Sequence, residues 1–192
     1  LNKNNVENAL KTLVTWSDPH PEMSGRDINE IATEFDLSVL DTMEKLSPGG
    51  AIYFMMDEND IERIMTSENA MIGSDGLPED EHPHPRLWGT FPRVLGRYVR
   101  ERKIMSLHNA VHRMTGLSAR NFKIKNRGLI KVNYFADITV FDPNEVIDKA
   151  TYENPKQLAV GIVIVLVNGQ VAWRGGQVSS TRSGKVLMRQ ST

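Results

Sequence analysis

The sequence has no cysteine among its 192 residues, and it has no excess of charge of one sign. Without cysteine the chain forms no disulfide, no thiolate metal site and no cysteine nucleophile. Lys and Arg number 23 against 24 Asp and Glu, which gives a formal net charge of -1. Nucleic acids and anionic lipid surfaces attract proteins with clustered excess Lys and Arg. We therefore expect no nucleic-acid partner and no membrane partner.

Long hydrophobic runs are also missing. The longest apolar stretch, residues 160–167, is far too short to cross a bilayer. Residues 1–5 are mostly polar and contain no apolar segment of a secretory signal. Apolar residues nevertheless make up 40% of the chain, which is enough for a sizeable core. These features predict a cytoplasmic globular protein with one domain, or with one domain and a small appendage.

The first two thirds of the sequence alternate short apolar runs with helical patterns. The strand candidates are residues 10–16, 51–56 and 70–74. The second of them is continuously apolar, as in a strand buried on both faces of a parallel sheet. Capping signals precede the helical patterns at Ser24 with Asp27, at Ser38 and at Asp57. This alternation of strands and helices predicts a parallel α/β sheet with right-handed crossovers.

The last third changes to β-strand patterns. Helices are still expected at residues 91–101 and at 107–114, the second capped by Ser106. From Arg127 onward strands are expected at residues 136–141, 160–167 and 170–173. Asn168-Gly169, between the last two, favours a type I′ hairpin turn. We interpret residues 142–158 as a surface connection and the tail from Ser179 as loosely held.

The most informative local feature is Ser74-Asp75-Gly76, at the end of the third strand candidate. Functional groups of α/β sheets and barrels lie just beyond the carboxyl ends of strands. Gly76 would let the backbone turn away sharply there. The carboxylate of Asp75 can act as a general base or as a metal ligand. It can equally cap the next helix or turn, and spacing alone leaves both interpretations open.

An acidic, proline-rich segment with two histidines and an arginine follows. His82 and His84 have acidic neighbours, but in an extended segment residues two apart point the same way without enclosing a metal ion. A solvated acidic loop is therefore the favoured interpretation for His82. Arg86 stands soon after the candidate strand, where a guanidinium can clamp a substrate carboxylate through two parallel hydrogen bonds. Its alternative role is a salt bridge to the nearby acidic residues.

The remaining candidates have structural interpretations. His20 lies between two prolines and is expected to pack in its loop, and Arg93 is expected to be structural. His108 and His112 have the i,i+4 spacing of helical zinc ligands, but they lack the acidic residue of the HExxH pattern, so we assign them to the surface. Methionines at helical spacing are expected in the core.

Two blocks carry a family resemblance: Gly73 to Pro78 (GSDGLP) and His84 to Leu95 (HPRLWGTFPRVL). With them the sequence closely resembles the N-acyl-D-amino-acid deacylases, which are the D-aminoacylases of the amidohydrolase superfamily. Matching segments stand upstream and downstream, so the resemblance covers nearly the whole chain; they are residues 20–26, 51–55, 114–116, 127–130, 136–138 and 167–169.

The resemblance implies an α/β fold with two parts. Residues 1–126 would be the C-terminal strand–helix units of a TIM-like (β/α)8 amidohydrolase barrel. Residues 127–192 would be the C-terminal segment of a small β-sandwich domain. The family's pattern includes a His-x-His pair, a metal-binding Cys and a Tyr-Pro-Tyr segment, but this sequence has no Cys, no His-x-His before the last barrel strand and no Tyr-Pro-Tyr. The chain is therefore identified as a C-terminal fragment of a deacylase, which we expect to be inactive alone.

The resemblance also implies an activity, the zinc-dependent hydrolysis of the amide bond of N-acyl-D-amino acids to a carboxylate and a free D-amino acid. In the intact enzyme Zn²⁺ would polarise the amide carbonyl and lower the pKa of its bound water. Asp75 would take the proton of the water and return it to the departing amine, Arg86 would pair with the α-carboxylate, and His84 would line the pocket. Apart from a contact by Asp75, no metal ligand is expected within this chain, and the fragment is not expected to bind zinc.

Two other functions stay open. A non-catalytic amidohydrolase-like module for binding or oligomerisation would bury its open sheet edges in a homo-oligomer. A related amidohydrolase that acts on cyclic amides is the other alternative, and the sequence block around Arg86 argues against it.

Overall fold

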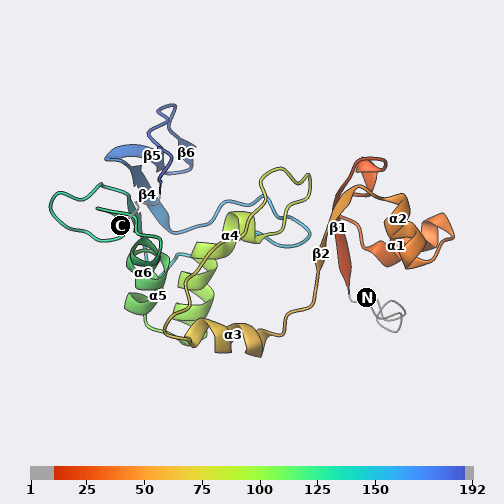
Figure 1. Cartoon of the computed structure of the whole chain (residues 1–192), viewed down its shortest axis with the longest axis horizontal. Coiled ribbons are helices and arrows are strands. Elements are labelled where there is room, and N and C mark those ends of the chain that lie inside the picture. Colours follow the sequence, from red (N-terminus) through yellow and green to blue (C-terminus); the bar gives the residue numbers. More distant parts are fainter. Residues whose placement is uncertain (1–10, 189–192) are drawn as a thin grey trace.

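A computed structural model of the chain describes residues 11–188, drawn in colour in Figure 1. A first lobe is followed by a group of helices and then by a β-sheet. The elements are β1 (Thr12–Ser17), the 3-10 helix η2 (Pro21–Met23), α1 (Ile28–Phe35), α2 (Val39–Lys45), β2 (Gly49–Tyr53), α3 (Glu58–Thr66), α4 (Arg86–Arg93), the π-helix η3 (Val94–Glu101), α5 (Leu107–Met114), α6 (Gly116–Asn121), β3 (Ile138–Phe141), β4 (Ile162–Val167), β5 (Gln170–Arg174) and β6 (Gln177–Val178). Across residues 11–188, no helix has the length and apolar character needed to cross a membrane.

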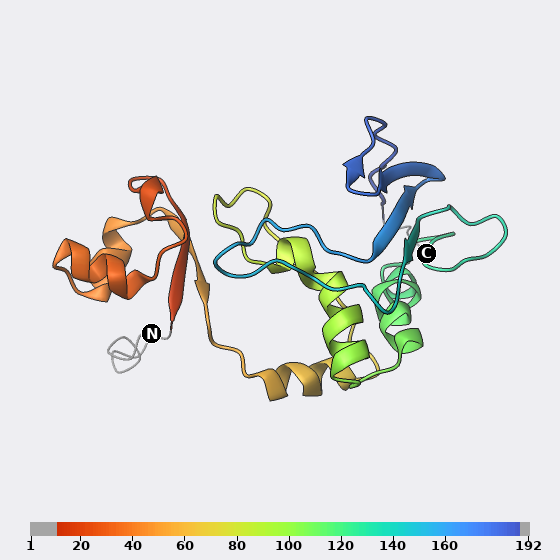
Figure 2. The same ribbon diagram turned by 180° about the vertical axis from the view of Figure 1, so that it is seen from behind.

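The first lobe consists of the antiparallel strands β1 and β2 and the helices η2, α1 and α2 between them (Figure 2). Leu13 lies opposite Ile52 in the strand pair. The core of the lobe is made of buried side chains from β1, from the helices and from the end of α2, namely Val14, Met23, Ile28, Ile31 and Leu46. The expected parallel pairing is wrong for these strands. The chain returns through η2, α1 and α2 and enters β2 running opposite to β1, so the two strands pair antiparallel.

Side-chain caps begin α1, α2 and α3. Asp27 and Asp57 each accept a hydrogen bond from the backbone N–H two residues later, both at 2.8 Å. Ser38 Oγ accepts from the backbone N–H of Asp41 at 3.1 Å, which confirms the expected start of α2. Ser24 is not the cap of α1, because it ends the 3-10 helix η2 and its hydroxyl instead donates to Glu81 Oε2 at 3.0 Å.

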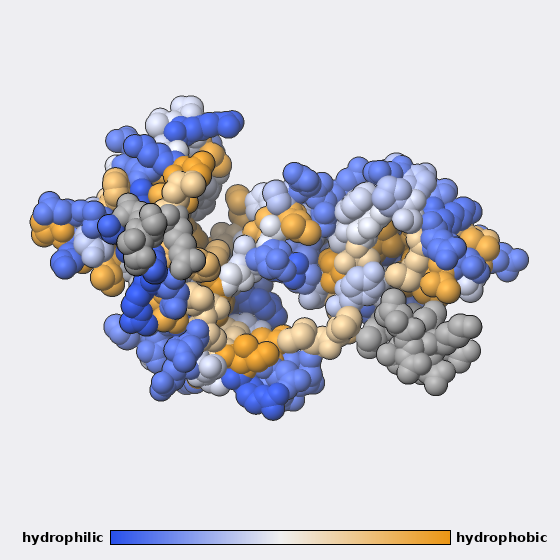
Figure 3. All heavy atoms as spheres, viewed as in Figure 1, coloured by the Kyte–Doolittle hydropathy of each residue, from blue (hydrophilic) through white to orange (hydrophobic). Residues whose placement is uncertain are grey.

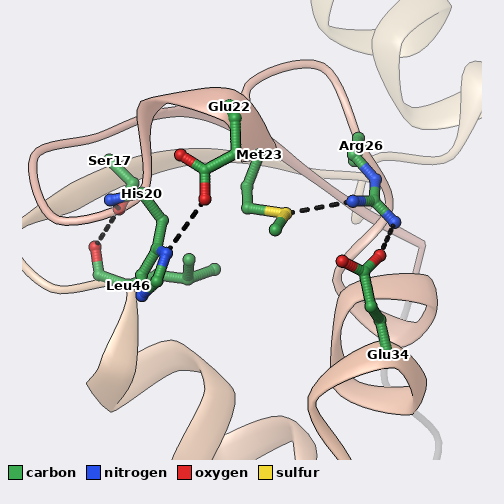
Figure 4. Close-up of polar contacts among 7 residues, drawn as sticks. All are labelled: Ser17, His20, Glu22, Met23, Arg26, Glu34 and Leu46. Atoms are coloured by element: carbon green, nitrogen blue, oxygen red, sulfur yellow. Dashed lines mark hydrogen bonds and ion pairs between the residues drawn. The ribbon is translucent and has the colours of Figure 1, made fainter.

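His20 has the structural role expected for it (Figure 4). Its Nδ1 lies 3.0 Å from Glu22 Oε1, and its ring packs against Phe35 with 5.2 Å between the ring centroids. The backbone N–H of His20 donates to Ser17 Oγ, which in turn donates to the carbonyl of Leu46 at 2.8 Å. These contacts fix the loop after β1 within the first lobe.

The helices form a second core, whose buried members are Met65, Val94, Leu95, Tyr98, Ala110 and Val146. Helices α4 and η3 follow one another without a break, and α4 begins at Arg86, five residues before the expected start at 91. Pro92 lies inside this stretch, has no backbone N–H to donate, and is followed two residues later by the π-helical hydrogen bonding of η3. Helix α5 begins after Ser106, as expected.

The strand expected at residues 70–74 is not formed among residues 11–188. These residues lie outside any sheet, and the backbone N–H of Ile72 donates to the carbonyl of Arg113 at 3.4 Å. A strand needs a neighbouring strand to bond its backbone groups, and the described part of the chain supplies none at this place.

The apolar run 51–56 is only partly a strand. β2 ends at Tyr53, and the side chains of Met55 and Met56 are exposed, at 69% and 65%. Figure 3 shows apolar side chains gathered along the segment that joins the first lobe to α3. The expectation of a strand buried on both faces is therefore wrong for Met55 and Met56. Of the methionines at helical spacing, Met65 is buried as expected, but Met43 is 38% exposed.

The C-terminal sheet has the order β3-β4-β5-β6, and all neighbouring strands are antiparallel. Its first three strands confirm the expected ones within two residues at each end. Asn168 and Gly169 have φ values of 50° and 79°, the two positive values that a type I′ turn requires. Residues 179–188 contain no helix or strand, and Asn168 Nδ2 donates to the carbonyl of Ser183 at 2.6 Å.

The segment between β3 and β4, residues 142–161, leaves the sheet and runs along α4 and η3 (light blue in Figures 1 and 2). We call it the strap. It is not the expected surface connection, because Val146 is 1% exposed and belongs to the helical core. Arg100 Nη1 donates to the carbonyl of Val146 at 2.7 Å. A Cβ at Gly96 would lie 2.5 Å from that carbonyl oxygen, so a glycine is what lets η3 approach the strap.

Replacing Val146 tests this packing. Val146→Ala should lower the free energy of unfolding by about 2 kcal/mol, because it removes buried methyl groups and leaves a cavity in the helical core. Val178→Ala is the matched control, since that side chain is 81% exposed and the change should stay within about 0.5 kcal/mol. Urea denaturation followed by circular dichroism measures both. Equal losses in the two variants would show that the strap is not part of the core.

Candidate active site at the start of helix α4

Asp75 and Arg86 come together at the edge of the helical part. Arg86 Nη2 lies 2.8 Å from Asp75 Oδ2, which makes an ion pair between two segments eleven residues apart. The side chain of Asp75 is 80% exposed and that of Arg86 is 38% exposed. Asp75 does not cap a helix, because the next helix begins only at Arg86 and its N-cap position is Pro85. The structure therefore pairs Asp75 with Arg86, two residues that the sequence singled out.

The backbone at Asp75 is in the left-handed region, with a φ of 49°. A non-glycine residue rarely adopts this conformation, and aspartate is among those that tolerate it best. Gly76, which was expected to make the turn, serves a different purpose. A Cβ there would lie 2.8 Å from Leu87 Cα, so Gly76 permits a close approach to the first turn of α4. The sharp turn belongs to Asp75 and the close contact to Gly76.

Arg86 is held at its backbone by the third candidate, His84. The backbone N–H of Arg86 donates to His84 Nδ1 at 3.0 Å, which leaves the ring proton of a neutral imidazole on Nε2. The carbonyl of Arg86 accepts from Thr90 Oγ1 at 2.8 Å. Arg86 Nε is buried and has no hydrogen-bond partner among residues 11–188. The backbone of Arg86 is thus fixed on both sides, and the guanidinium still has an N–H group without a partner among residues 11–188.

Burial lowers the pKa of His84 to about 4, and the positive charge of Arg86 acts in the same direction. The negative charge of Asp75 opposes the shift but does not cancel it. His84 is therefore neutral at pH 7. A neutral imidazole adds no positive charge beside Arg86, so the guanidinium is the cationic group among the three side chains.

His82 is not in a solvated loop. Its backbone N–H donates to the carbonyl of Thr15 at 3.0 Å, and its Nε2 lies 2.6 Å from the carbonyl of Tyr152. Its ring fills the space beside Gly25, where a Cβ would come within 2.7 Å of His82 Nδ1. His82 therefore joins the loop before α4 to both the first lobe and the strap. Its role in the structure is to tie three segments together.

A cavity of about 760 Å³ lies between the first lobe, helix α4 and the strap. His84 and Arg86 line it from the loop and the helix, Phe54 from the end of the first lobe, and Tyr152 from the strap. No sequence motif pointed to Phe54 or Tyr152 as residues of the site. The signal for Tyr152 was a single aromatic residue in a polar segment, which is too common to identify a site.

The described residues offer little to a metal ion. Residues 11–188 contain no group of three or more His, Cys, Asp and Glu side chains that could hold one. Beside the cavity, Asp75 would contribute one carboxylate.

Arg93 is structural as expected, since its Nη1 lies 3.1 Å from Asp148 Oδ2 on the strap.

With this geometry in view, comparison with known proteins identifies the class. The model of the amidohydrolase family matches residues 35–173, which is most of the chain. The chain belongs to the amidohydrolase family.

Its relatives within the family include D-amino-acid deacylases. The chain is 50% identical to the D-aminoacylase of Alcaligenes xylosoxydans xylosoxydans over 98% of its own length and 39% of that protein's. It superposes on a D-aminoacylase structure from work on the binuclear metal centre with a TM-score of 0.93 and 51% identity, over 98% of this chain and 40% of that one. The N-acyl-D-glutamate deacylase of Bordetella bronchiseptica, solved with zinc and a phosphonate inhibitor that mimics the tetrahedral intermediate, gives a TM-score of 0.86 and 47% identity over 91% and 38%. The likeness confirms the expected mixed α/β amidohydrolase fold, and the chain spans about two fifths of the length of these relatives.

Two glycines test how tightly the site is packed. Gly76→Ala should lower the free energy of unfolding by about 1–3 kcal/mol, because the new methyl group would collide with the backbone of Leu87. Gly73→Ala, three residues away, is the control, since a Cβ at Gly73 meets nothing within 4 Å. Thermal or urea unfolding measures both variants. A Gly76→Ala variant as stable as Gly73→Ala would contradict the close approach of residue 76 to α4.

The lowered pKa of His84 predicts a pH dependence of stability. Between about pH 4 and pH 6.5 the unfolded chain binds more protons at this residue than the folded chain does. The stabilisation is therefore complete above pH 6.5 and is lost as the pH falls toward 4. His84→Gln should reduce the drop in the free energy of unfolding between pH 7 and pH 4.5, measured by urea denaturation at each pH. His112→Gln, an exposed histidine on α5, controls for the loss of a histidine; the same drop in wild type and His84→Gln would argue against a neutral His84.

Proposed function

We propose that this chain takes part in hydrolysing the amide bond of N-acyl-D-amino acids, as a portion of an enzyme longer than itself. The observation that carries the proposal is the pairing of Asp75 with Arg86 at 2.8 Å, beside a cavity that Arg86 lines. A carboxylate for proton transfer and a guanidinium for an anionic substrate thus stand next to each other. The similarity to D-aminoacylase and to N-acyl-D-glutamate deacylase supports the same reaction and substrate class.

Arg86 binds the α-carboxylate of the substrate in this proposal. A guanidinium holds a carboxylate through charge-assisted hydrogen bonds in a planar fork. The carboxylate of Asp75 forms an ion pair with Nη2 of Arg86. This supports the role, because the α-carboxylate of the substrate has the same charge and shape. An exposed ion pair contributes only about 0–1 kcal/mol, so an arriving substrate carboxylate can displace Asp75. Because His84 is neutral, it does not compete with Arg86 for the substrate carboxylate, which is attracted by the guanidinium.

Asp75 acts as the general acid/base. Once the substrate occupies Arg86, the carboxylate of Asp75 is released next to the bound molecule. It then accepts a proton from the attacking water as the C–O bond forms, and returns it to the nitrogen as the C–N bond breaks. The left-handed backbone at Asp75 and the contact of Gly76 with Leu87 support this role, because they fix the base relative to Arg86.

The proposal assigns residues 1–126 to the end of the catalytic barrel and residues 127–192 to the small β domain. Apart from a contact by Asp75, it also assigns the zinc of the intact enzyme to side chains other than those described here. The absence of any group of three ligating side chains among residues 11–188 is the reason, since a catalytic zinc site takes about three protein ligands. No step of the reaction above is derived through the metal.

Binding of N-acetyl-D-methionine by the chain tests the role of Arg86. Arg86→Met should weaken binding about tenfold or more, because it removes charged hydrogen bonds to the carboxylate. Asp75→Asn should bind as tightly as wild type or up to about fivefold more tightly, because the competitor for the guanidinium loses its charge. Titration calorimetry, or an NMR titration where affinity is low, measures both. Arg63→Met is the control, since Arg63 is 80% exposed on α3 and pairs only with Asp60 among the described residues.

Zinc titration and a deacetylation assay complete the test. The chain alone should neither bind zinc tightly nor release acetate from N-acetyl-D-methionine, and stoichiometric zinc binding with turnover would contradict the assignment of the metal ligands. In an enzyme of the relatives' full length that carries this sequence, Asp75→Asn should lower kcat by about 10²-fold or more with a smaller change in KM. Equal binding by wild type and Arg86→Met would refute the proposed substrate contact.

A further inference from the structure

Three aromatic rings from three separate segments meet in the cavity beside Arg86. The ring of Tyr152, on the strap, lies 4.6 Å from the ring of Phe54 and 5.3 Å from the ring of His84, measured between centroids. All three residues line the cavity. The rings are tilted or edge-on to one another, the arrangements in which aromatic side chains attract each other. Tyr152 stands in the middle, since it contacts both of the others.

The backbone of Tyr152 is held in place from the opposite side. Its carbonyl lies 2.6 Å from His82 Nε2, and His82 is itself bonded to the carbonyl of Thr15 on β1. The strap therefore cannot swing away from the first lobe without breaking these contacts. A ring held by its backbone and by two neighbouring rings loses little further freedom when a ligand packs on it, which favours a binding surface.

We call the rings of Phe54, Tyr152 and His84 the aromatic wall. This wall adjoins Arg86. The ring of His84 contacts the ring of Tyr152. Its Nδ1 accepts a hydrogen bond from the backbone N–H of Arg86 at 3.0 Å. A molecule whose carboxylate pairs with Arg86 thus has an apolar surface within reach. Ligand pockets in proteins combine such apolar walls with a few well-placed polar groups that fix orientation.

We propose that Tyr152 is a specificity-determining residue, whose ring contacts the apolar group of an N-acyl-D-amino acid bound through its carboxylate to Arg86. This inference rests on the proposed function. Tyr152 touches the substrate away from the reacting bond, so it selects among substrates without taking part in proton transfer. The strap, which leaves the C-terminal sheet, thereby supplies one wall of the substrate pocket.

An N-acyl-D-amino acid has two apolar groups, the acyl chain and the side chain, and two matched ligand series separate them. The first series lengthens the acyl group of D-alanine from acetyl to propionyl and butyryl. The second keeps the acetyl group and lengthens the side chain from D-alanine to D-norvaline and D-norleucine. Dissociation constants for the chain are measured by NMR titration. In wild type, each methylene that packs on the aromatic wall should tighten binding about fourfold in one of the two series.

Variants of Tyr152 then decide the inference. Tyr152→Ala should abolish the gain per methylene in that series, Tyr152→Leu should reduce it, and Tyr152→Phe should retain it. Tyr134→Ala is the matched control, because Tyr134 lies outside the cavity. Nuclear Overhauser contacts between the Tyr152 ring and the ligand methyl group in wild type give a second readout that needs no variant and no refolding.

The outcomes separate the inference from the function on which it rests. If wild type binds both series through Arg86 but the gain per methylene is the same in Tyr152→Ala, and no ring contact is seen, the role of Tyr152 is refuted while the proposed function stands. If no ligand binds, or binding ignores Arg86→Met, the proposed function itself is refuted and the inference falls with it. If Tyr152→Ala removes the gain in affinity per methylene in both series, the ring of Tyr152 contacts both the acyl chain and the side chain of the ligand.

Discussion

The close contact between the strap and the helix α4–η3 is the constraint on which the site depends. The strap approaches the helix closely at Gly89 and Gly96, where a Cβ would lie 2.8 Å from the Cβ of Asp148 and 2.5 Å from the backbone carbonyl oxygen of Val146. Close-packed interiors transmit such constraints because they contain few voids. One contact therefore fixes the helix whose first residue is Arg86 and, from the same strap, places Tyr152 in the cavity.

The charge state of the residues around Arg86 depends on the burial of His84 as well as on the ion pair with Asp75. His84 lies within hydrogen-bonding distance of the backbone of Arg86 and would repel its guanidinium if protonated. Because burial keeps the pKa of His84 near 4, that repulsion is absent at neutral pH. Among the described residues, Asp75 pairs with Arg86. The same arrangement suits an anionic ligand, because the other arginine that lines the cavity, Arg93, already pairs with Asp148.

The sequence predicted best the features that depend on local interactions. The hairpin at Asn168-Gly169, the cap at Ser38 and the strands of the C-terminal sheet each depend on residues close in the chain, and each is confirmed. The start of α4 at Arg86 was missed, because Gly89 and Pro92 lower the helical propensity of this segment while packing against the strap compensates.

The features that depend on distant partners could not be predicted in this way. Residues 70–74 have the composition of a buried strand, but a strand forms only beside another strand. The burial of Val146 and the contacts of His82 depend on segments more than forty residues away, so a polar local context was misleading. For the candidate site, the residues Asp75, His84 and Arg86 were found from motifs, and the structure adds how they contact one another; their roles in catalysis and binding stay predictions.

The course of the strap has a consequence for how such proteins diversify. A boundary drawn at residues 126 and 127 separates helices from sheet along the sequence, yet Val146, Asp148 and Tyr152 lie beyond that boundary and pack among the helices and the first lobe. An exchange of the C-terminal sheet between two relatives would carry these three side chains with it. Recombination at that boundary would therefore transplant side chains that pack inside residues 1–126, so the two parts are expected to co-evolve rather than shuffle as independent modules.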